Sequence, residues 1–313
     1  MFAQIFSLII SHLLLPAMFI YWFAKNKYQS RSDWIVLMLM SGTYVCYIFV
    51  AGRWDWLSFY WRYLFGILFI WYFFKTLPKI KSLPKSRRRV PRDKLVFGIQ
   101  VLVFIVFGIF LFFSLKGRSY DGPAEPLQFP LKDGAYYVAQ GGNAAIINFH
   151  NLGLAQKYAL DIVKMYPWGT RARGLYPKEL SKYAIYGDTV FSPCDGVISQ
   201  VRDSLDDQIP PEKNPRQPAG NFIGIKTGSF HVYLAHLQRG SVMVKVGDSV
   251  KVGQPLARVG NTGYTSEPHL HIHAERGDSS GFLQGEGVPL TFDGRFLVRN
   301  DIVKRFKNKK SSH

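Results

Sequence analysis

Histidines that could bind a metal are concentrated in one stretch near the end of this chain. Five of its eight histidines are His231, His236, His269, His271 and His273. Alternate residues of a β-strand point to the same face, so residues 269, 271 and 273 are predicted to project together. A row of imidazoles that faces a histidine from another strand is typical of a zinc site. The alternative is a solvated, histidine-rich strand.

Two upstream residues favour the metal site over that alternative. Asp161 interrupts an apolar run at residues 156–163, and a buried carboxylate needs a partner, for which a metal ion is suitable. His150 lies eleven positions earlier. Catalytic zinc usually takes three protein ligands and leaves one position for water. We therefore predict one zinc ion per chain, with His150, Asp161 and His271 as its ligands.

The charge of the chain is strongly positive but unevenly distributed. The formal net charge is +18, and 13 of these charges lie before residue 119. A basic tail at residues 301–313 accounts for the rest, so the body of the C-terminal half is close to neutral. A nucleic-acid-binding domain needs a basic face, so we expect no nucleic-acid partner. Cys46 and Cys194 lie in different surroundings and are not expected to form a disulfide.

The first 118 residues are predicted to form a transmembrane region with about four helices. Each apolar segment is close to the length that crosses a bilayer, and the second is the shortest. The first has no basic n-region and no cleavage site, so it is interpreted as a retained helix. Trp and Tyr residues lie near the segment ends, as in interfacial belts. The segments are Phe2–Ala24, Trp34–Val50, Trp56–Phe74 and Val96–Leu115.

The loops predict the orientation of these helices. Residues 75–94 carry nine basic residues and a single aspartate, and the first loop is also basic. The positive-inside rule places both loops in the cytoplasm, so both termini are expected outside. The arginine run at residues 87–89 can alternatively be interpreted as a nucleic-acid patch, but a role in topology and anionic-lipid contact is favoured.

The C-terminal half is predicted to be an all-β domain at residues 134–300, preceded by a linker at residues 119–133. Short strand-like runs alternate with turn signals, which indicates a mostly antiparallel small barrel or sandwich. Residues 246–254 predict a tight hairpin. Residues 164–188 and 202–220 are expected to be long loops, either bordering a substrate groove or decorating the surface. The predicted strands are 144–149, 158–163, 197–201, 222–226, 230–236, 241–246 and 256–259.

An ordered set of motifs resembles the LytM/lysostaphin-like zinc metallopeptidases, over roughly residues 134–276. The set comprises Asp161, Tyr233-Leu-Ala-His236-Leu237, the valine–glycine run at residues 246–253, Gly260-Asn-Thr-Gly263 and Pro268-His-Leu-His271. The resemblance implies the duplicated hybrid motif fold. It also implies that Asp161 and His271 are zinc ligands, and that His236 and His269 are the catalytic pair.

The resemblance also implies an activity and a location. The zinc-bound water would attack a peptide carbonyl, while one histidine accepts its proton and the other stabilises the oxyanion. The expected substrate is a peptide of peptidoglycan. The expected location is the bacterial cytoplasmic membrane, as a multi-pass protein whose peptidase domain lies outside. The lipid bilayer and a membrane protein are the candidate partners there.

Two positions depart from the family pattern. The usual first ligand is a His four positions before the Asp, where this chain has Lys157, so His150 is expected to reach the site from the preceding strand. A common Glu after the second motif His is replaced by His273, interpreted as a residue behind the ligand or on the surface. His231 lies five positions before His236, which predicts opposite faces of the strand.

Three functions remain open from the sequence. The first is a membrane-anchored zinc endopeptidase. The second is an inactive relative that binds cell wall or regulates another hydrolase, which the Lys157 departure would explain. The third is a transporter with an attached β-domain, which the low polarity of the apolar segments disfavours. Zinc content separates the first two.

Overall fold

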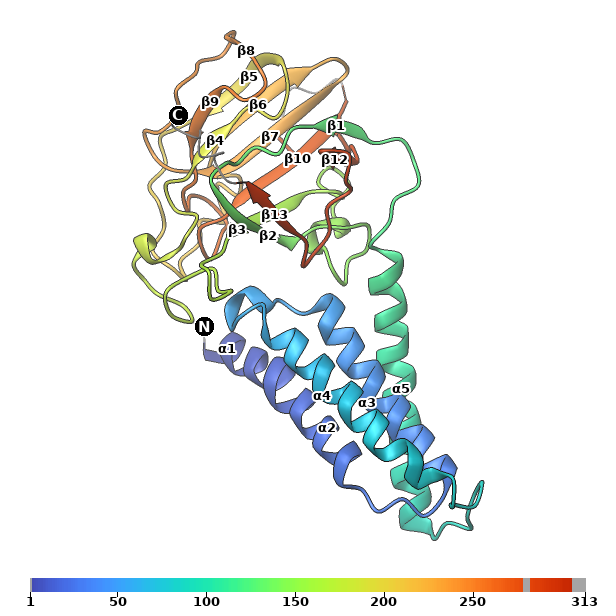
Figure 1. The fold of residues 1–313 in the computed structure, drawn as a ribbon. Helices are drawn as coiled ribbons and strands as arrows, with labels where there is room; N and C mark the ends of the chain where they lie inside the picture. Colours follow the sequence, from blue (N-terminus) through green and yellow to red (C-terminus); the bar gives the residue numbers. More distant parts are fainter. Residues whose placement is uncertain (1, 278–281, 306–313) are drawn as a thin grey trace, which may run out of the picture. The chain divides into compact units, whose positions relative to one another are not determined.

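The computed structural model describes residues 2–277 and 282–305 and divides them into two compact units (Figure 1). One unit comprises Met1–Trp54 and Ser58–Leu115. The other comprises Asp55–Leu57 and Lys116–His313, so three residues from the first half of the chain belong to the C-terminal unit.

Four helical segments of the first unit are long and apolar enough to cross a membrane, which confirms the predicted number. The first contains a π-helical turn at Ile10–Leu14, directly before Pro16, which cannot donate to the carbonyl four residues back. The third begins at Trp61, not Trp56, because residues 54–56 form a separate 3₁₀ turn. The helices are α1 (Phe2–Ile9), α2 (Leu15–Lys25), α3 (Arg31–Ala51), α4 (Trp61–Thr76) and α5 (Pro91–Lys116).

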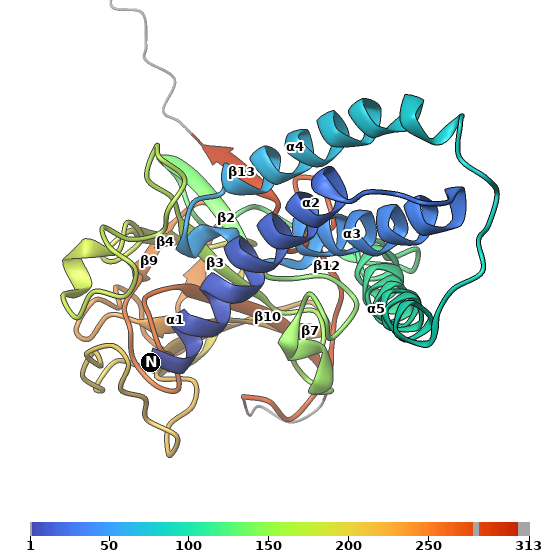
Figure 2. The ribbon, with the colours of Figure 1, turned by 90° about the horizontal axis from the view of Figure 1, so that it is seen from below.

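Polar contacts and aromatic packing join these helices, whose ribbons Figure 2 shows from below. The Ser41 hydroxyl of α3 donates to the Phe19 carbonyl of α2 at 3.2 Å. The Trp34 indole of α3 donates to Thr76 of α4 at 2.9 Å. The Tyr44 and Phe107 rings of α3 and α5 meet edge-to-face, 4.6 Å apart. Buried polar groups at these contacts therefore have partners within the unit.

The two basic loops lie at the same end of this unit. Arg31, at the start of α3, donates to the Leu83 carbonyl in the loop between α4 and α5. Asp33 accepts hydrogen bonds from Arg87 at 3.0 Å and from Arg89 at 2.7 Å. This pairing agrees with the expectation that both loops lie on the same side of a bilayer.

The C-terminal unit is mostly antiparallel β-structure, as predicted. Its main sheet has the order β13-β2-β3-β10-β7-β6-β5-β8, with β11 beside β10. β4 and β9 form an antiparallel pair, and β1 and β12 a parallel one. The strands are β1 (Glu125–Leu127), β2 (Gly134–Gln140), β3 (Leu160–Lys164), β4 (Thr189–Phe191), β5 (Gly196–Arg202), β6 (Asn221–Thr227), β7 (Phe230–Leu237), β8 (Ser249–Val250), β9 (Pro255–Arg258), β10 (Leu270–Arg276), β11 (Glu286–Gly287), β12 (Leu290–Phe292) and β13 (Ile302–Arg305).

Residue alternation divides the central strands β3, β10 and β7 between two faces. Ile162, Leu234 and Ile272 point into a fully buried apolar core. The residues between them point to the opposite face, where Asp161 of β3 and Ala235 of β7 flank His271 of β10. The burial of the apolar face fixes the register, because a slip of one residue would exchange the two faces.

Two predicted strands are wrong, and in both cases side chains provide the hydrogen bonds that a sheet would supply. At residues 144–149 the chain turns, and the Asn148 side chain donates to the carbonyls of Gly142 and Ala159. At residues 241–246 the backbone N–H groups of Val242 and Lys245 donate to aspartate side chains. Such local bonds compete with a β-ladder. The predicted hairpin at residues 246–254 is also wrong, because β8 pairs with β5.

The domain boundaries also need correction. Leu127, Phe129 and Leu131 are buried in the apolar core, so the stretch expected to be a linker at residues 119–133 contributes to the folded unit. In the predicted tail, Ile302–Arg305 form the edge strand β13, and its remaining residues, 306–313, lie outside the described residues. Strands β2 and β13 were missed by the sequence prediction.

Candidate metal centre

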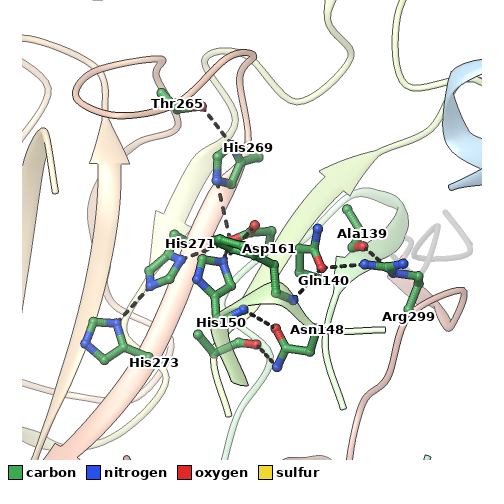
Figure 3. A network of polar contacts seen from close by, with 12 residues as sticks. Ala139, Gln140, Asn148, His150, Asp161, Thr265, His269, His271, His273 and Arg299 are labelled. Carbon is green, nitrogen blue, oxygen red and sulfur yellow. Dashed lines mark hydrogen bonds and ion pairs between the residues drawn. The ribbon is translucent and has the colours of Figure 1, made fainter. Parts of the chain in front are cut away.

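Asp161 and His271 are direct neighbours on the polar face of the sheet. They are cross-strand partners on β3 and β10, and His271 Nδ1 lies 2.9 Å from Asp161 Oδ1. Figure 3 shows these side chains pointing toward one another. Sequence alternation alone predicts which face they occupy, and the observed register brings their ligand atoms together.

His150 reaches the same carboxylate from a 3₁₀ turn at Phe149–Leu152, not from a strand as expected. Its Nε2 lies 3.0 Å from each oxygen of Asp161. Asn148, fully buried, caps this turn by accepting from the His150 backbone N–H, while its amide donates to nearby carbonyls (Figure 3). The turn is therefore tied to the start of β3, which carries Asp161.

The ligand atoms of His150, Asp161 and His271 all lie within 4.8 Å of one another. A tetrahedral zinc ion with ligand distances of about 2.0–2.1 Å separates its ligands by about 3.3 Å, so this set has a compatible size. The Lys157 ammonium lies 5.4 Å from the Tyr158 ring centre. The structure thus brings together the three predicted ligands and gives Lys157 a different contact.

His236 joins the site through an unusual backbone conformation. Strand alternation would place His236 on the same face as Val232 and Leu234, which point into the core. Its φ of 63° lies in the left-handed region, however, so the alternation breaks at this residue. Its ring lies 4.7 Å from that of His269. The expectation that His231 and His236 face opposite sides is therefore wrong. His231 stacks on Tyr233, farther along the same row of side chains.

His269 immediately precedes β10 and faces Asp161 from the other side of the carboxylate (Figure 3), with its Nε2 3.5 Å from Oδ1. Its Nδ1 lies 2.9 Å from the Glu267 carbonyl, and His236 Nδ1 lies 2.8 Å from the Thr262 carbonyl. A carbonyl only accepts, so both Nδ1 atoms carry the proton. Both neutral rings therefore have a lone pair on Nε2, as a proton acceptor needs.

The electrostatic surroundings separate these two histidines. Burial lowers the pKa of His236 well below its usual value, with the neighbouring histidines adding to the effect. Burial also lowers the pKa of His269, but the Asp161 carboxylate and the Glu267 carbonyl and carboxylate together raise it by more, so its pKa is raised overall. Burial raises the pKa of Asp161, yet His150 and His269 lower it well below the usual value. Asp161 is therefore ionised at neutral pH.

Behind His271, a chain of hydrogen bonds ends at Glu275. His271 Nε2 lies 2.9 Å from His273 Nδ1, and His273 Nε2 lies 2.8 Å from Glu275 Oε1. Three backbone N–H groups, of residues 283–285, donate to the Glu275 carboxylate. His273 is buried, so the expectation of a position behind the ligand holds. The sequence prediction missed Glu275, although strand alternation places it on the same face of β10 as His271 and His273.

This chain determines which nitrogen of His271 has a free lone pair. Burial raises the pKa of Glu275, but His273 and the backbone N–H groups lower it by more, so Glu275 is a carboxylate that only accepts. His273 Nε2 must therefore donate. Burial lowers the pKa of His273, so the neutral ring accepts at Nδ1 from His271. His271 donates from Nε2 and keeps a lone pair on Nδ1.

That lone pair points at Asp161 Oδ1, which is also an electron-pair donor. Burial lowers the pKa of His271 to about 3, so a proton on Nδ1 does not bridge the two atoms at neutral pH. Two such atoms 2.9 Å apart repel each other unless a cation lies between them. The donor set of two imidazoles and one carboxylate is one that zinc uses. The residues therefore fit a bound zinc ion.

Comparison with known proteins identifies this part of the chain. Residues 181–281 match the model of peptidase family M23, a stretch that includes His236, His269 and His271 but neither His150 nor Asp161. The chain contains a peptidase family M23 domain. The resemblance to LytM/lysostaphin-like peptidases is thereby confirmed at the level of the family.

Individual relatives match this chain over limited lengths. An uncharacterized metalloprotease of Buchnera aphidicola is 35% identical over 86 residues, which are 27% of this chain and 19% of that protein. The catalytic domain of lysostaphin from Staphylococcus simulans is 25% identical, with 38% of this chain and 85% of that one covered and a TM-score of 0.24. A zinc-containing peptidase from Vibrio cholerae is 22% identical, with 37% and 46% covered and a TM-score of 0.23.

The role of Asn148 in holding His150 leads to a first prediction. Replacing Asn148 by Ala leaves buried carbonyls unsatisfied, which should lower the free energy of unfolding by about 1–3 kcal/mol. Zinc affinity should also fall, because the turn that carries His150 loosens. Thermal unfolding and zinc titration of the full chain measure both. Asn151→Ala, which removes only a 3.4 Å bond to the Lys157 carbonyl, is the control and should change neither.

Proposed function

We propose that this protein is a membrane-anchored zinc metalloendopeptidase that hydrolyses amide bonds in peptidoglycan peptides outside the cytoplasmic membrane. The observation that carries the proposal is that ring nitrogens of His150 and His271 and the Asp161 carboxylate lie within 4.8 Å of one another, beside the His236–His269 pair. His150, Asp161 and His271 would hold the ion. The M23 match supports the peptide substrate.

The bound zinc ion would supply a water of low pKa and polarise the scissile carbonyl. Nε2 of His269 lies beside the ligand cluster, 3.5 Å from Asp161 Oδ1, which places it to accept a proton from water at the ion. His269 thus takes a proton from water and returns it to the leaving amine. His236 keeps its proton on Nδ1 and faces the same space, where it positions the water.

The four long apolar helices support the proposal that the protein is anchored in a membrane. The contact between the two basic loops supports the proposal that both loops lie on the same side of that membrane. If that side is cytoplasmic, the single crossing by α5 after the second basic loop leaves the M23 domain outside, where peptidoglycan is found. The competing proposal of an inactive, wall-binding domain was motivated by Lys157. The position of His150 weakens it, because the ligand set is complete without that residue.

A second prediction concerns the carboxylate behind His271. Glu275→Gln converts the acceptor that fixes the His273 and His271 tautomers into a neutral amide, so zinc affinity should fall about 10- to 100-fold. Competition with a fluorescent chelator measures the affinity in the full chain. The control is Glu286→Gln on the neighbouring β11, where the side chain is exposed. Equal zinc affinities in Glu275→Gln and the native chain would contradict the tautomer assignment.

A third prediction tests the activity. The zinc-loaded full chain should cleave peptidoglycan stem or cross-bridge peptides, detected by mass spectrometry of the products. His269→Ala should retain zinc but lose at least about 100-fold in kcat, because it lacks the proton acceptor. His231→Ala is the control and should keep the native rate. A native chain that binds zinc and cleaves none of these peptides would favour the inactive, wall-binding alternative.

A further inference from the structure

A buried arginine outside the metal cluster is connected to the loop that carries His269. Arg171 is 1% exposed, and its Nε and Nη2 lie 2.6 and 2.5 Å from Glu267 Oε2. Nη2 also donates to the Leu175 carbonyl at 3.1 Å. Arg171 and Trp56, which packs on it, both lie outside the residues that match the family model. The site chemistry described above uses neither.

The face of the Arg171 guanidinium is covered by Trp56. The guanidinium carbon lies 3.6 Å from the Trp56 ring centre, a close cation–π contact. The Tyr176 ring stacks on the same indole at 5.2 Å. Asp55 adds a backbone contact, since its carbonyl accepts from the Arg171 N–H at 3.0 Å. These residues belong to the C-terminal unit, although Asp55 and Trp56 come from the segment that joins α3 to α4.

Both residues that pack on Trp56 contact the segment just before His269. The Tyr176 hydroxyl donates to the Ser266 carbonyl at 2.7 Å, while Arg171 holds the Glu267 side chain. The Glu267 carbonyl is the acceptor of the His269 Nδ1 proton. The Thr265 hydroxyl donates to that same carbonyl at 2.7 Å. The orientation and tautomer of His269 therefore depend on where residues 265–267 are held.

We propose that Arg171, through the Glu267 side chain, and Trp56, through Arg171 and Tyr176, are positioning residues that hold the Ser266–Glu267 segment and thereby aim His269 at the metal cluster. The inference rests on the proposed peptidase function. If it holds, the segment between α3 and α4, which contains Trp56, contributes to catalysis. A buried ion pair is weak evidence for a role in stability. The Arg171–Glu267 pair, however, involves a residue only two positions before the catalytic side chain of His269.

The test compares four variants of the full, zinc-loaded chain. Arg171→Met removes the charge and its hydrogen bonds, and Trp56→Ala removes the supporting ring. Trp56→Phe keeps an aromatic face, and Arg239→Met removes an exposed arginine that pairs with Asp206. Displacement of a catalytic group by about 1 Å can reduce the rate by about 100-fold. We therefore expect kcat to fall 10- to 100-fold in Arg171→Met and Trp56→Ala, with KM and zinc content unchanged.

The controls separate positioning from stability. Trp56→Phe should recover most of the native kcat, and Arg239→Met should match the native chain. Thermal unfolding shows the folded fraction, to which each kcat is normalised. If Arg171→Met and Trp56→Ala only lower the unfolding temperature and keep the native kcat per folded, zinc-loaded molecule, the positioning role is overturned.

A second readout keeps this inference distinct from the peptidase proposal. A phosphinic dipeptide imitates the tetrahedral intermediate and should contact both zinc and His269, and calorimetry measures its binding without turnover. If the native chain cleaves no peptide, the peptidase proposal fails. A weaker affinity for the phosphinic dipeptide in Arg171→Met and Trp56→Ala would still support the positioning role. Equal affinities in all chains would overturn it.

Discussion

The repulsion between lone pairs around Asp161 is the constraint on which the site depends. Three imidazole nitrogens lie within 2.9 to 3.5 Å of this ionised carboxylate. The Glu275 chain makes the His271 Nδ1 atom an electron-pair donor, and its neighbour Asp161 Oδ1 is another. A cation converts this repulsion into ligation. The metal proposal therefore follows from hydrogen-bond donors and acceptors together with the family resemblance.

The sequence predicted the parts of the site that depend on strand periodicity. Asp161 interrupts an apolar run and His271 alternates with Leu270 and Ile272, so strand alternation predicts that both lie on the polar face of the sheet. His150 was predicted as a ligand, but its 3₁₀ turn was not, because the turn depends on buried hydrogen bonds of Asn148 with residues distant in sequence. His236 departs from periodicity through a left-handed φ, which the flanking apolar pattern does not indicate. Most errors of the sequence prediction at the site therefore arise from side-chain hydrogen bonds to the backbone and from an unusual backbone conformation.

Support for the site comes from several parts of the C-terminal unit. Glu275 is fixed by the backbone of residues 283–285, and His236 by the Thr262 carbonyl. His269 depends on Glu267, whose partner Arg171 packs on Trp56 from the segment between α3 and α4. Such outer contacts orient metal ligands and catalytic groups. Asp55 and Trp56, which lie between α3 and α4 in the sequence, therefore have a structural task in the C-terminal unit.

The measurement that tests the central claim most directly is the zinc content of the purified full chain beside that of His150→Ala, by inductively coupled plasma mass spectrometry. The account predicts about one zinc ion per native chain and a large loss in His150→Ala, with Lys157→Ala unchanged as the control. Zinc retained equally by His150→Ala would contradict the role of His150 as the third ligand. A native chain that binds no zinc at neutral pH would contradict the metal centre itself.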